Sequence, residues 1–499
     1  MRKLSHRGAA DRVATAMTAA ARVASAPGRP LLLLGAFELA DVGYLAEEFF
    51  VSGTAHSYAP AGGVADYTTR MVALTPADPA DFNGTVLVEW LNVSAGIDAP
   101  AVWMMAHREI VRSGYAYVAV SAQRVGVEGG ASMLGMDMSL KTQDPARYAS
   151  LRHPGDEFSY DVFSHVGALI ADSGQDAGQD VDVLRGLSPD RLIGVGESQS
   201  AMFLTTYINA VDPLAKVYDG FVVHSRFGPA APLDGSSIFD DSSMTRPVPF
   251  RPDLRVPLMT VITETDVFGA AREGYYPARQ PDNERLRVWE IPGAAHADNY
   301  TIQVAPIDSG SAPLADIVAA YTPTNSLMGQ QLPYYINFGP QHHYVLQAAL
   351  DAVNTWVGSG TAPATAPPLE VTGGDRPQPV PDTHGLARGG VRTPWVDVPI
   401  ARTSGGVGAG SAPASLMAAL FGSGEPFAAA TVHRLYPGGA QDYLTRFTAA
   451  LDMAIGSGFI LTADREEILA LAAGQYSRAY SRADSRADSR ANSRADPAP

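Results

Sequence analysis

The chain has 499 residues, of which 46% are hydrophobic and 18% charged, a composition typical of a folded protein with a large core and incompatible with disorder over its whole length. The formal net charge is −16, so the surface repels phosphate backbones and nucleic acid is excluded as the expected partner. Cysteine is absent, which excludes disulfides, thiolate zinc sites and a cysteine nucleophile.

Residues 1–28 are rich in alanine and are predicted to form a loose N-terminal tail. A basic start and the sequence Val23-Ala-Ser-Ala26 resemble a signal peptide, but charged residues interrupt the apolar region that export requires. We therefore expect a cytoplasmic protein, with export as the alternative. The most apolar run, residues 30–37, is far shorter than the ~20 residues that span a bilayer, so no membrane span is expected.

Residues 67–74 and 85–91 have the composition of strands, and the turn formers between them predict an antiparallel hairpin. Further strand-length apolar runs alternate with helix-length segments. The predicted strands are 115–121, 192–196, 220–224, 258–263 and 286–291, and the predicted helices are 100–113, 159–187, 200–211 and 343–357. This alternation predicts an α/β domain over residues 29–360, with a mostly parallel sheet covered by helices on both faces.

Two long segments rich in Pro, Gly, Asp and Ser, 225–255 and 300–341, interrupt this domain as insertions. Long loops in a compact domain are often functional, and we expect both to fold over the functional site and form an apolar pocket. The apolar side chains available for this pocket are Phe227, Phe239, Phe250, Tyr321, Leu327, Met328 and Tyr334, with Met133, Met136 and Met138 as further candidates.

The composition becomes rich in Pro and Gly near residue 361 and marks a C-terminal extension, 361–475, that we expect to pack on the α/β domain. Helices are predicted within it at 439–456 and 463–473. In residues 476–499 the sequence Ser-Arg-Ala recurs every four residues with few apolar side chains. Such a repeat buries too little apolar surface to offset its ordering entropy, so it predicts a disordered tail.

One predicted strand runs into Gly196-Glu-Ser198-Gln-Ser200 and then into an apolar helix. A nucleophile elbow places its serine on a strained turn between strand and helix, with small residues two positions away on either side. Gly196 and Ser200 meet this requirement, although Ser200 replaces the usual glycine. One alternative is a dinucleotide fingerprint that begins at Gly194, but Gln199 occupies its third glycine position. The other is an ordinary turn with a hydroxyl helix cap.

A nucleophilic serine needs a base oriented by an acid, and elbow folds supply these in the chain order Ser, acid, His. Asp266 follows the predicted strand 258–263, and His296 follows the next strand. Both lie where open α/β sheets place their ligands, so we predict a triad of Ser198, Asp266 and His296. Glu264, two residues before Asp266, is the alternative acid.

The tetrahedral intermediate of such a reaction needs two backbone donors. We predict the amide of Gln199 as one donor and the amide of Val93 or Ser94, after strand 85–91, as the other. The histidines have no close metal-ligand spacing, so neither a metal nor a cofactor is expected. Three further polar residues near the strand ends are candidates for lining the pocket: Asn92, Glu197 and His224.

These motifs resemble the α/β-hydrolase superfamily, and more narrowly the long family described as "alpha/beta hydrolase domain" proteins. The matching stretches lie within roughly residues 40–475: 43–55, Val88-Glu-Trp-Leu-Asn-Val-Ser94, Gly196-Glu-Ser-Gln-Ser200, Glu264-Thr-Asp266, His296-Ala-Asp298 and Thr393-Pro-Trp-Val-Asp-Val-Pro399. The resemblance implies an α/β-hydrolase fold and a serine esterase that acts on a small-molecule ester. Acyl transfer, amide or lactone cleavage by the same triad, and a catalytically inactive binding protein remain alternatives.

Overall fold

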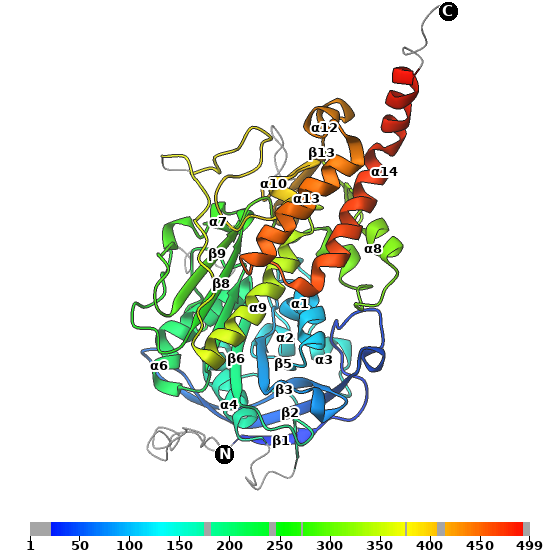
Figure 1. The fold of residues 1–499 in the computed structure, drawn as a ribbon. Coiled ribbons are helices and arrows are strands. Elements are labelled where there is room, and N and C mark those ends of the chain that lie inside the picture. The colour runs from blue at the N-terminus through cyan, green and yellow to red at the C-terminus, as the bar shows by residue number, and fades with distance from the viewer. Residues whose placement is uncertain are drawn as a thin grey trace, which may run out of the picture.

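A nine-stranded sheet lies at the centre of the molecule, which is a computed structural model that describes residues 21–173, 181–238, 246–270, 273–374, 377–406 and 415–492 (Figure 1). The order of its strands is β1-β2-β3-β5-β4-β6-β7-β8-β9. Strands β5 to β9 run parallel with β4, and β1, β2 and β3 extend the sheet in antiparallel pairing. The predicted α/β fold with a mostly parallel sheet is confirmed. The strands are β1 (Arg22–Ser25), β2 (Tyr44–His56), β3 (Val64–Pro76), β4 (Thr85–Trp90), β5 (Ala116–Val120), β6 (Arg191–Glu197), β7 (Gly220–His224), β8 (Leu258–Thr263) and β9 (Leu286–Ile291).

The predicted hairpin of residues 67–74 and 85–91 is wrong, because β5 lies between these two strands. Strand β3 pairs antiparallel with β5, with Met71 opposite Val120, and β4 pairs parallel with β5 from the other side. The turn formers reverse the chain direction but do not make the strands neighbours. Strand β4 is buried along its whole length. The helix that follows it carries the chain back to the start of the sheet, so that the next strand, β5, pairs with β4 in parallel. The hairpin in this region is instead β2 with β3.

Helices cover both faces of the sheet. Helices α1 (Ala101–Arg112) and α9 (Gln341–Ser359) contribute to one buried hydrophobic cluster, and α4 (Ser159–Ala171) and α5 (Gln199–Thr206) contribute to the other. Alternate residues of β4 face the two clusters, with Leu87 in the first and Val86 and Val88 in the second. The shorter helices are α2 (Arg124–Glu128), α3 (Leu140–Gln143), α6 (Asp212–Ala215), α7 (Glu264–Phe268), α8 (Leu314–Ala320), α10 (Pro394–Asp397), α11 (Leu416–Leu420) and α12 (Ala429–Leu435).

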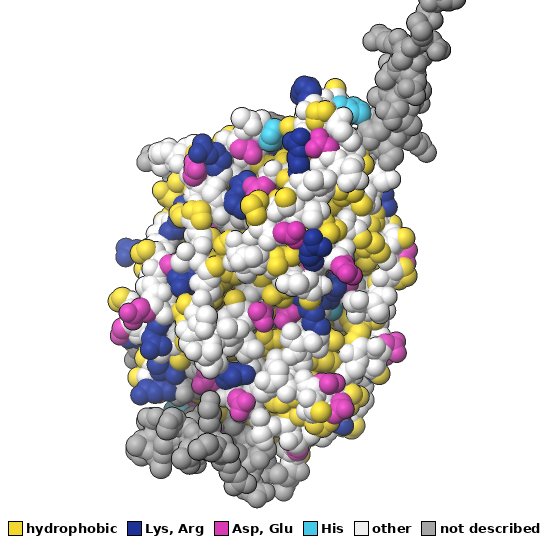
Figure 2. All heavy atoms as spheres, viewed as in Figure 1, with side chains coloured by type: hydrophobic (Ala, Val, Ile, Leu, Met, Phe, Trp, Pro, Cys, Tyr) yellow, Lys and Arg dark blue, Asp and Glu magenta, His cyan; other side chains and the backbone are white. Residues whose placement is uncertain are grey.

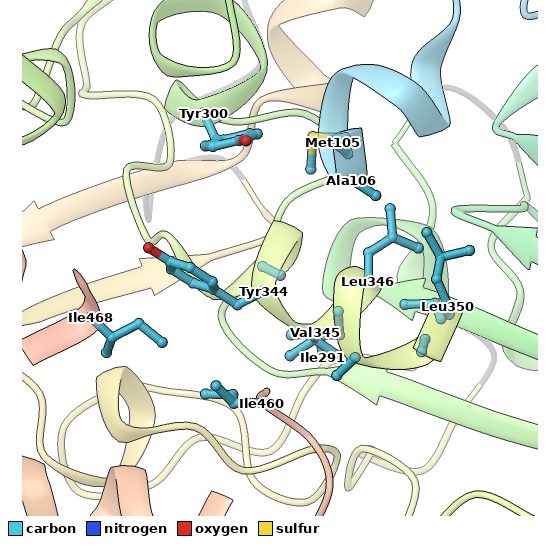
Figure 3. Close-up of a cluster of buried hydrophobic side chains, with 14 of the residues drawn as sticks. Met105, Ala106, Ile291, Tyr300, Tyr344, Val345, Leu346, Leu350, Ile460 and Ile468 are labelled. Atoms are coloured by element: carbon cyan, nitrogen blue, oxygen red, sulfur yellow. The ribbon is translucent and has the colours of Figure 1, made fainter. Parts of the chain in front are cut away.

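The C-terminal extension shares the first of these clusters. Helices α13 (Gly439–Gly456) and α14 (Arg465–Asn492) bury Phe447, Leu451 and Leu471 against it. Figure 3 shows Ile460 and Ile468 beside side chains of α9, within one continuous apolar interior. Two ion pairs, Arg108 with Glu467 and Arg112 with Asp464, join α1 to the extension. Two small antiparallel pairs complete the strands, β10 (Ser326–Leu327) with β11 (Gln330–Gln331) and β12 (Ala401–Ser404) with β13 (Ser423–Pro426).

Helix α14 corrects the prediction of a disordered tail from residue 476. It continues through Asn492, and its C-terminal part projects from the rest of the molecule (Figure 1). Tyr476 and Tyr480 are buried, so the helix is already formed when it enters the repeat. Extending an existing helix costs far less than starting one, and the alanines and arginines of the repeat are good helix formers. Residues 493–499 lie outside the described residues, as does most of the predicted N-terminal tail, of which Arg22–Ser25 forms β1.

The surface mixes charges of both signs. On the face seen in Figure 2, acidic and basic side chains alternate with apolar ones. None of the helices in the described part of the chain combines the length and the apolar character that a membrane crossing needs.

Candidate active site

Ser198 occupies a strained turn between β6 and α5. Its backbone angles are φ 55° and ψ −114°, a region that residues with a side chain rarely adopt. The Ser198 amide donates to the carbonyl oxygen of His224 at 2.9 Å, which fixes the turn against the end of β7. The predicted elbow geometry is therefore present, with the serine at the carboxyl edge of the parallel sheet.

Gly196 and Ser200 pack against each other inside this turn. A Cβ atom at Gly196 would lie 3.3 Å from the backbone and hydroxyl of Ser200, so only glycine fits easily. The Ser200 hydroxyl donates to the carbonyl oxygen of Glu197 at 2.8 Å and accepts from the Glu197 amide at 2.9 Å. Ser200 thus stabilises the turn through hydrogen bonds that a glycine could not make.

Asp266 and His296 meet at the ends of the neighbouring strands β8 and β9. His296 Nδ1 lies 2.6 Å from Asp266 Oδ1, and Asp266 Oδ2 accepts from the Thr263 amide at 2.8 Å and the Thr263 hydroxyl at 2.6 Å. Asp266 is fully buried, and His296 is 8% exposed. Burial by itself lowers the pKa of His296, but the attraction and hydrogen bond of Asp266, together with the attraction of Glu197, outweigh this effect and raise the pKa above its ordinary value.

Glu264 turns away from His296. Its Oε1 accepts from the Ser404 hydroxyl at 2.7 Å and the Gly405 amide at 3.1 Å, and its Oε2 accepts from the Gly293 amide at 2.8 Å. Burial raises the pKa of this carboxyl. The contacts join the end of β8 to the C-terminal extension, so of the two candidate acids only Asp266 contacts the histidine.

The two candidate amides in the loop after β4 have different partners. The Ser94 amide donates to Asn92 Oδ1 at 2.8 Å within a local turn. The Val93 amide donates to the side-chain oxygen Oε1 of Gln199 at 3.2 Å. The Gln199 side chain therefore lies where any other acceptor of the Val93 amide would lie, and Gln199 is the first residue of α5.

Glu197 lies on the other side of the histidine ring. Its Oε1 is 3.5 Å from His296 Nε2, and Asn92 Nδ2 donates to its Oε2 at 2.9 Å. Burial raises the pKa of Glu197 to about 7. Asn92 and Glu197 were predicted only as pocket residues, and the contact with His296 joins positions 99 residues apart, from 197 to 296, which no local pattern reveals.

His224 does not line a pocket, because it is 1% exposed and its Nε2 lies 2.8 Å from His342 Nε2. Asp298 lies beyond this pair, with its Oδ2 3.9 Å from His342 Nδ1. Burial lowers the pKa of His342 to about 4 and raises that of Asp298 to about 7, so the imidazole is neutral at pH 7. No group of three or more histidine or acidic side chains within the described residues could hold a metal ion.

An apolar cover lies over His296. We call it the cover cluster, and it consists of Phe227, Leu327, Leu332, Ile336, Ala418, Leu420 and Phe421. The Phe227 ring stacks on the His296 ring with centroids 5.2 Å apart. The Ala297 amide donates to the carbonyl oxygen of Leu420 at 3.0 Å, which brings the segment around α11 next to the histidine. Both insertions and the C-terminal extension thus contribute to the cover, whereas the sequence did not indicate a contribution from the C-terminal extension.

The apolar residues expected in this region separate into two groups. Four of them belong to the cover cluster or pack against it: Phe227, Leu327, Tyr334 and Met133. The others lie elsewhere: Phe250 and Tyr321 are buried in the two main clusters, Met136 and Met328 are exposed, Met138 is half-buried outside the cover cluster, and Phe239 lies outside the described residues.

One known protein family matches most of the chain. A family model described as "Alpha/beta hydrolase domain" matches residues 11–470. Among solved structures, an α/β serine hydrolase without a lid from Xanthomonas campestris is similar at 14% identity and a TM-score of 0.29, with 55% of this chain and 96% of that chain covered. A fungal esterase from Rhizomucor miehei is similar at 11% identity and a TM-score of 0.28, covering 56% and 82%. Scores this low add nothing to the family match, and a search of curated proteins found no match.

Proposed function

The chain belongs to the alpha/beta hydrolase domain family, and we propose that it is a serine hydrolase that cleaves a carboxylic ester through an acyl-enzyme intermediate. Ser198 is the nucleophile, His296 the general base and acid, and Asp266 the residue that orients the histidine. The observation that carries this proposal is the 2.6 Å contact between Asp266 Oδ1 and His296 Nδ1, at the sheet edge where Ser198 occupies its strained turn.

The Asp266 contact decides which nitrogen of His296 carries the proton. With Nδ1–H donating to the carboxylate, Nε2 is free to accept the proton of the Ser198 hydroxyl. As that proton moves, Ser198 Oγ forms a bond to the carbonyl carbon of the ester, and the π electron pair moves onto the carbonyl oxygen. Asp266 then stabilises the imidazolium.

The oxyanion accepts hydrogen bonds from the backbone amides of Gln199 and Val93. We choose Val93 over Ser94 because the partner of the Ser94 amide, Asn92, is held in place by Glu197. The partner of the Val93 amide is the Gln199 side chain alone, which the substrate carbonyl displaces.

The proton on Nε2 passes to the alcohol oxygen as the carbon–oxygen bond breaks, which leaves the acyl group on Ser198. A water molecule repeats the sequence, giving a proton to His296 and releasing the acid while the proton returns to Ser198. The cover cluster favours an ester with an apolar acyl or alcohol group, because one of its members, Phe227, stacks on His296 and the others are apolar as well.

A fluorophosphonate probe tests the nucleophile, because only an activated serine reacts with it. We expect labelling of the wild type and its loss in Ser198→Ala, together with a loss of several powers of ten in turnover of p-nitrophenyl esters. Ser132→Ala is the matched control, since Ser132 also follows a Gly-x pair but lies in a half-buried loop and donates to the carbonyl oxygen of Met136. Labelling and turnover that survive in Ser198→Ala would refute the proposal.

If Ser198 is labelled but the enzyme cleaves only amides or lactones, the nucleophile stands and the ester assignment is wrong. A panel of aryl esters, anilides and lactones of matched acyl groups therefore accompanies the labelling.

A further inference from the structure

His296 is flanked by a carboxylate at each ring nitrogen. Asp266 contacts Nδ1, and Glu197 Oε1 lies 3.5 Å from Nε2, the nitrogen that exchanges protons with serine and leaving group. The mechanism above uses Asp266 and leaves Glu197 without a role. A carboxylate this close to a nitrogen that becomes positively charged acts on it directly.

The position of the Glu197 carboxylate is fixed from both ends. Its backbone is held by Ser200 in the elbow, and Asn92 Nδ2 donates to its Oε2 at 2.9 Å and to its carbonyl oxygen at 3.2 Å. Asn92 is itself oriented, because its Oδ1 accepts from the Ser94 amide. Oε1 thus remains directed at Nε2, and the side chain is only 11% exposed, so water screens the contact weakly.

Few other charged groups lie near Glu197 and His296. The titratable groups packed around it are Asp266 on α7, Glu89 on β4, His224 at the end of β7, His342 on α9 and, beyond His342, Asp298. Burial lowers the pKa of both histidines, so they are neutral at pH 7, and it raises the pKa of Glu89 to about 8. Attraction by Asp266 and Glu197 raises the pKa of His296. Glu197, whose own pKa is about 7, exerts this attraction in its ionised form at and above that pH.

We propose that Glu197 is a second catalytic carboxylate, which stabilises the imidazolium of His296 through Nε2 while Ser198 attacks. This inference rests on the proposed function. In the step, the Ser198 proton moves to Nε2, the new N–H is attracted to Glu197 Oε1, and the same proton leaves to the alcohol oxygen of the ester. Glu197 gains and loses no proton in the cycle, so its contribution is electrostatic.

The contact between Glu197 and His296 favours the transition state, but in the resting enzyme it opposes the reaction. An ionised Glu197 keeps His296 protonated to higher pH, so Nε2 is free to accept the serine proton only at more alkaline pH. Removing the charge therefore has two effects of opposite sign. The acidic limb of the pH profile moves to lower pH, and the rate on the plateau falls.

The test compares pH profiles of kcat and kcat/KM for the wild type and Glu197→Gln. We expect the acidic limb to move down by about 1–3 pH units, the size of shift that a charge at this distance causes. The plateau kcat should fall about tenfold. A tenfold change in rate has the same free energy as a shift of one pKa unit. Glu264→Gln is the matched control: it removes another buried carboxylate, which does not contact His296, and should leave the limb in place.

An unchanged limb in Glu197→Gln, or an equal shift in Glu264→Gln, would overturn the inference. If Glu197→Gln does not fold, as judged by thermal unfolding, Glu197→Asp replaces it. This variant keeps the charge but withdraws it by one methylene, and it should shift the limb in the same direction by less.

A second measurement does not depend on turnover. The His296 imidazole is titrated by NMR in histidine-labelled Ser198→Ala, with and without Glu197→Gln, and its resonance is identified by its loss in His296→Gln. We expect its pKa to fall when Glu197 is neutralised, and an unchanged pKa would refute the contact. Absence of fluorophosphonate labelling in the wild type would instead refute the proposed function, so the two failures are distinguishable.

Discussion

Replacing Asp266 by Asn should abolish catalysis by turning the proton of His296 to the wrong nitrogen. Asp266 Oδ2 accepts from both the amide and the hydroxyl of Thr263, and these donors require an acceptor at that position. In Asp266→Asn the side-chain oxygen therefore stays at Thr263, and the NH₂ group points at His296 Nδ1. Nδ1 must then accept, which places the imidazole proton on Nε2, where it blocks the transfer from Ser198.

The expected loss is about 10⁴-fold in kcat, the known effect of this tautomer change in a serine triad, or about 5.5 kcal/mol of transition-state stabilisation at 1.36 kcal/mol per factor of ten. The fold should survive, because the contacts to Thr263 and the shape of the side chain are kept. Turnover of p-nitrophenyl esters and thermal unfolding measure the two quantities on the same samples.

Glu264→Gln should lower the stability of the fold and leave turnover nearly unchanged, the reverse of Asp266→Asn. Its carboxylate accepts three hydrogen bonds from Ser404, Gly405 and Gly293, and one of them must be lost to an NH₂ group. Loss of a buried acceptor costs about 1–3 kcal/mol of stability, while kcat should change by less than about threefold. If Glu264→Gln were inactive and Asp266→Asn retained turnover, the reasoning from the Asp266–His296 contact would be wrong.

Two further predictions concern stability. Burial raises the pKa of Asp298 from 3.8 to about 7, so the folded state keeps a proton that the unfolded chain loses. The protonated carboxyl therefore contributes to the stability of the fold fully below pH 3.8, and this contribution is lost as the pH rises through 7. Asp298→Asn should therefore match the wild type in urea unfolding near pH 4 and exceed it by about 4 kcal/mol at pH 8, and a difference independent of pH would contradict this assignment. Ser200→Ala removes both hydrogen bonds to Glu197 and should lower the unfolding free energy by about 1–3 kcal/mol, whereas an unchanged denaturation midpoint would show that the hydroxyl does not hold the turn.

Features that depend on residues close together along the chain could be predicted from the sequence. The apolar strand-length runs that alternate with helices indicated the α/β fold, and the turn at Ser198 follows from a strand, a small-residue pattern and a helix within a dozen positions. The order of Ser198, Asp266 and His296 along the chain also pointed to one edge of the sheet, because parallel strands end on the same side. The family match over residues 11–470 agrees with the fold, while the roles of the three residues remain proposals.

Features that depend on long-range packing appeared only in three dimensions. Turn formers between β3 and β4 reverse the chain, but the insertion of β5 between them depends on β4 being buried on both faces. Glu264 and Asp266 are two residues apart and chemically similar, and only α7 with its partners on the C-terminal extension turns one of them away from His296. The contact of Glu197 with His296 likewise joins two strand ends distant in the chain. Local patterns determine which elements form and where they turn, whereas the choice among similar side chains depends on packing between elements that meet only in the folded state.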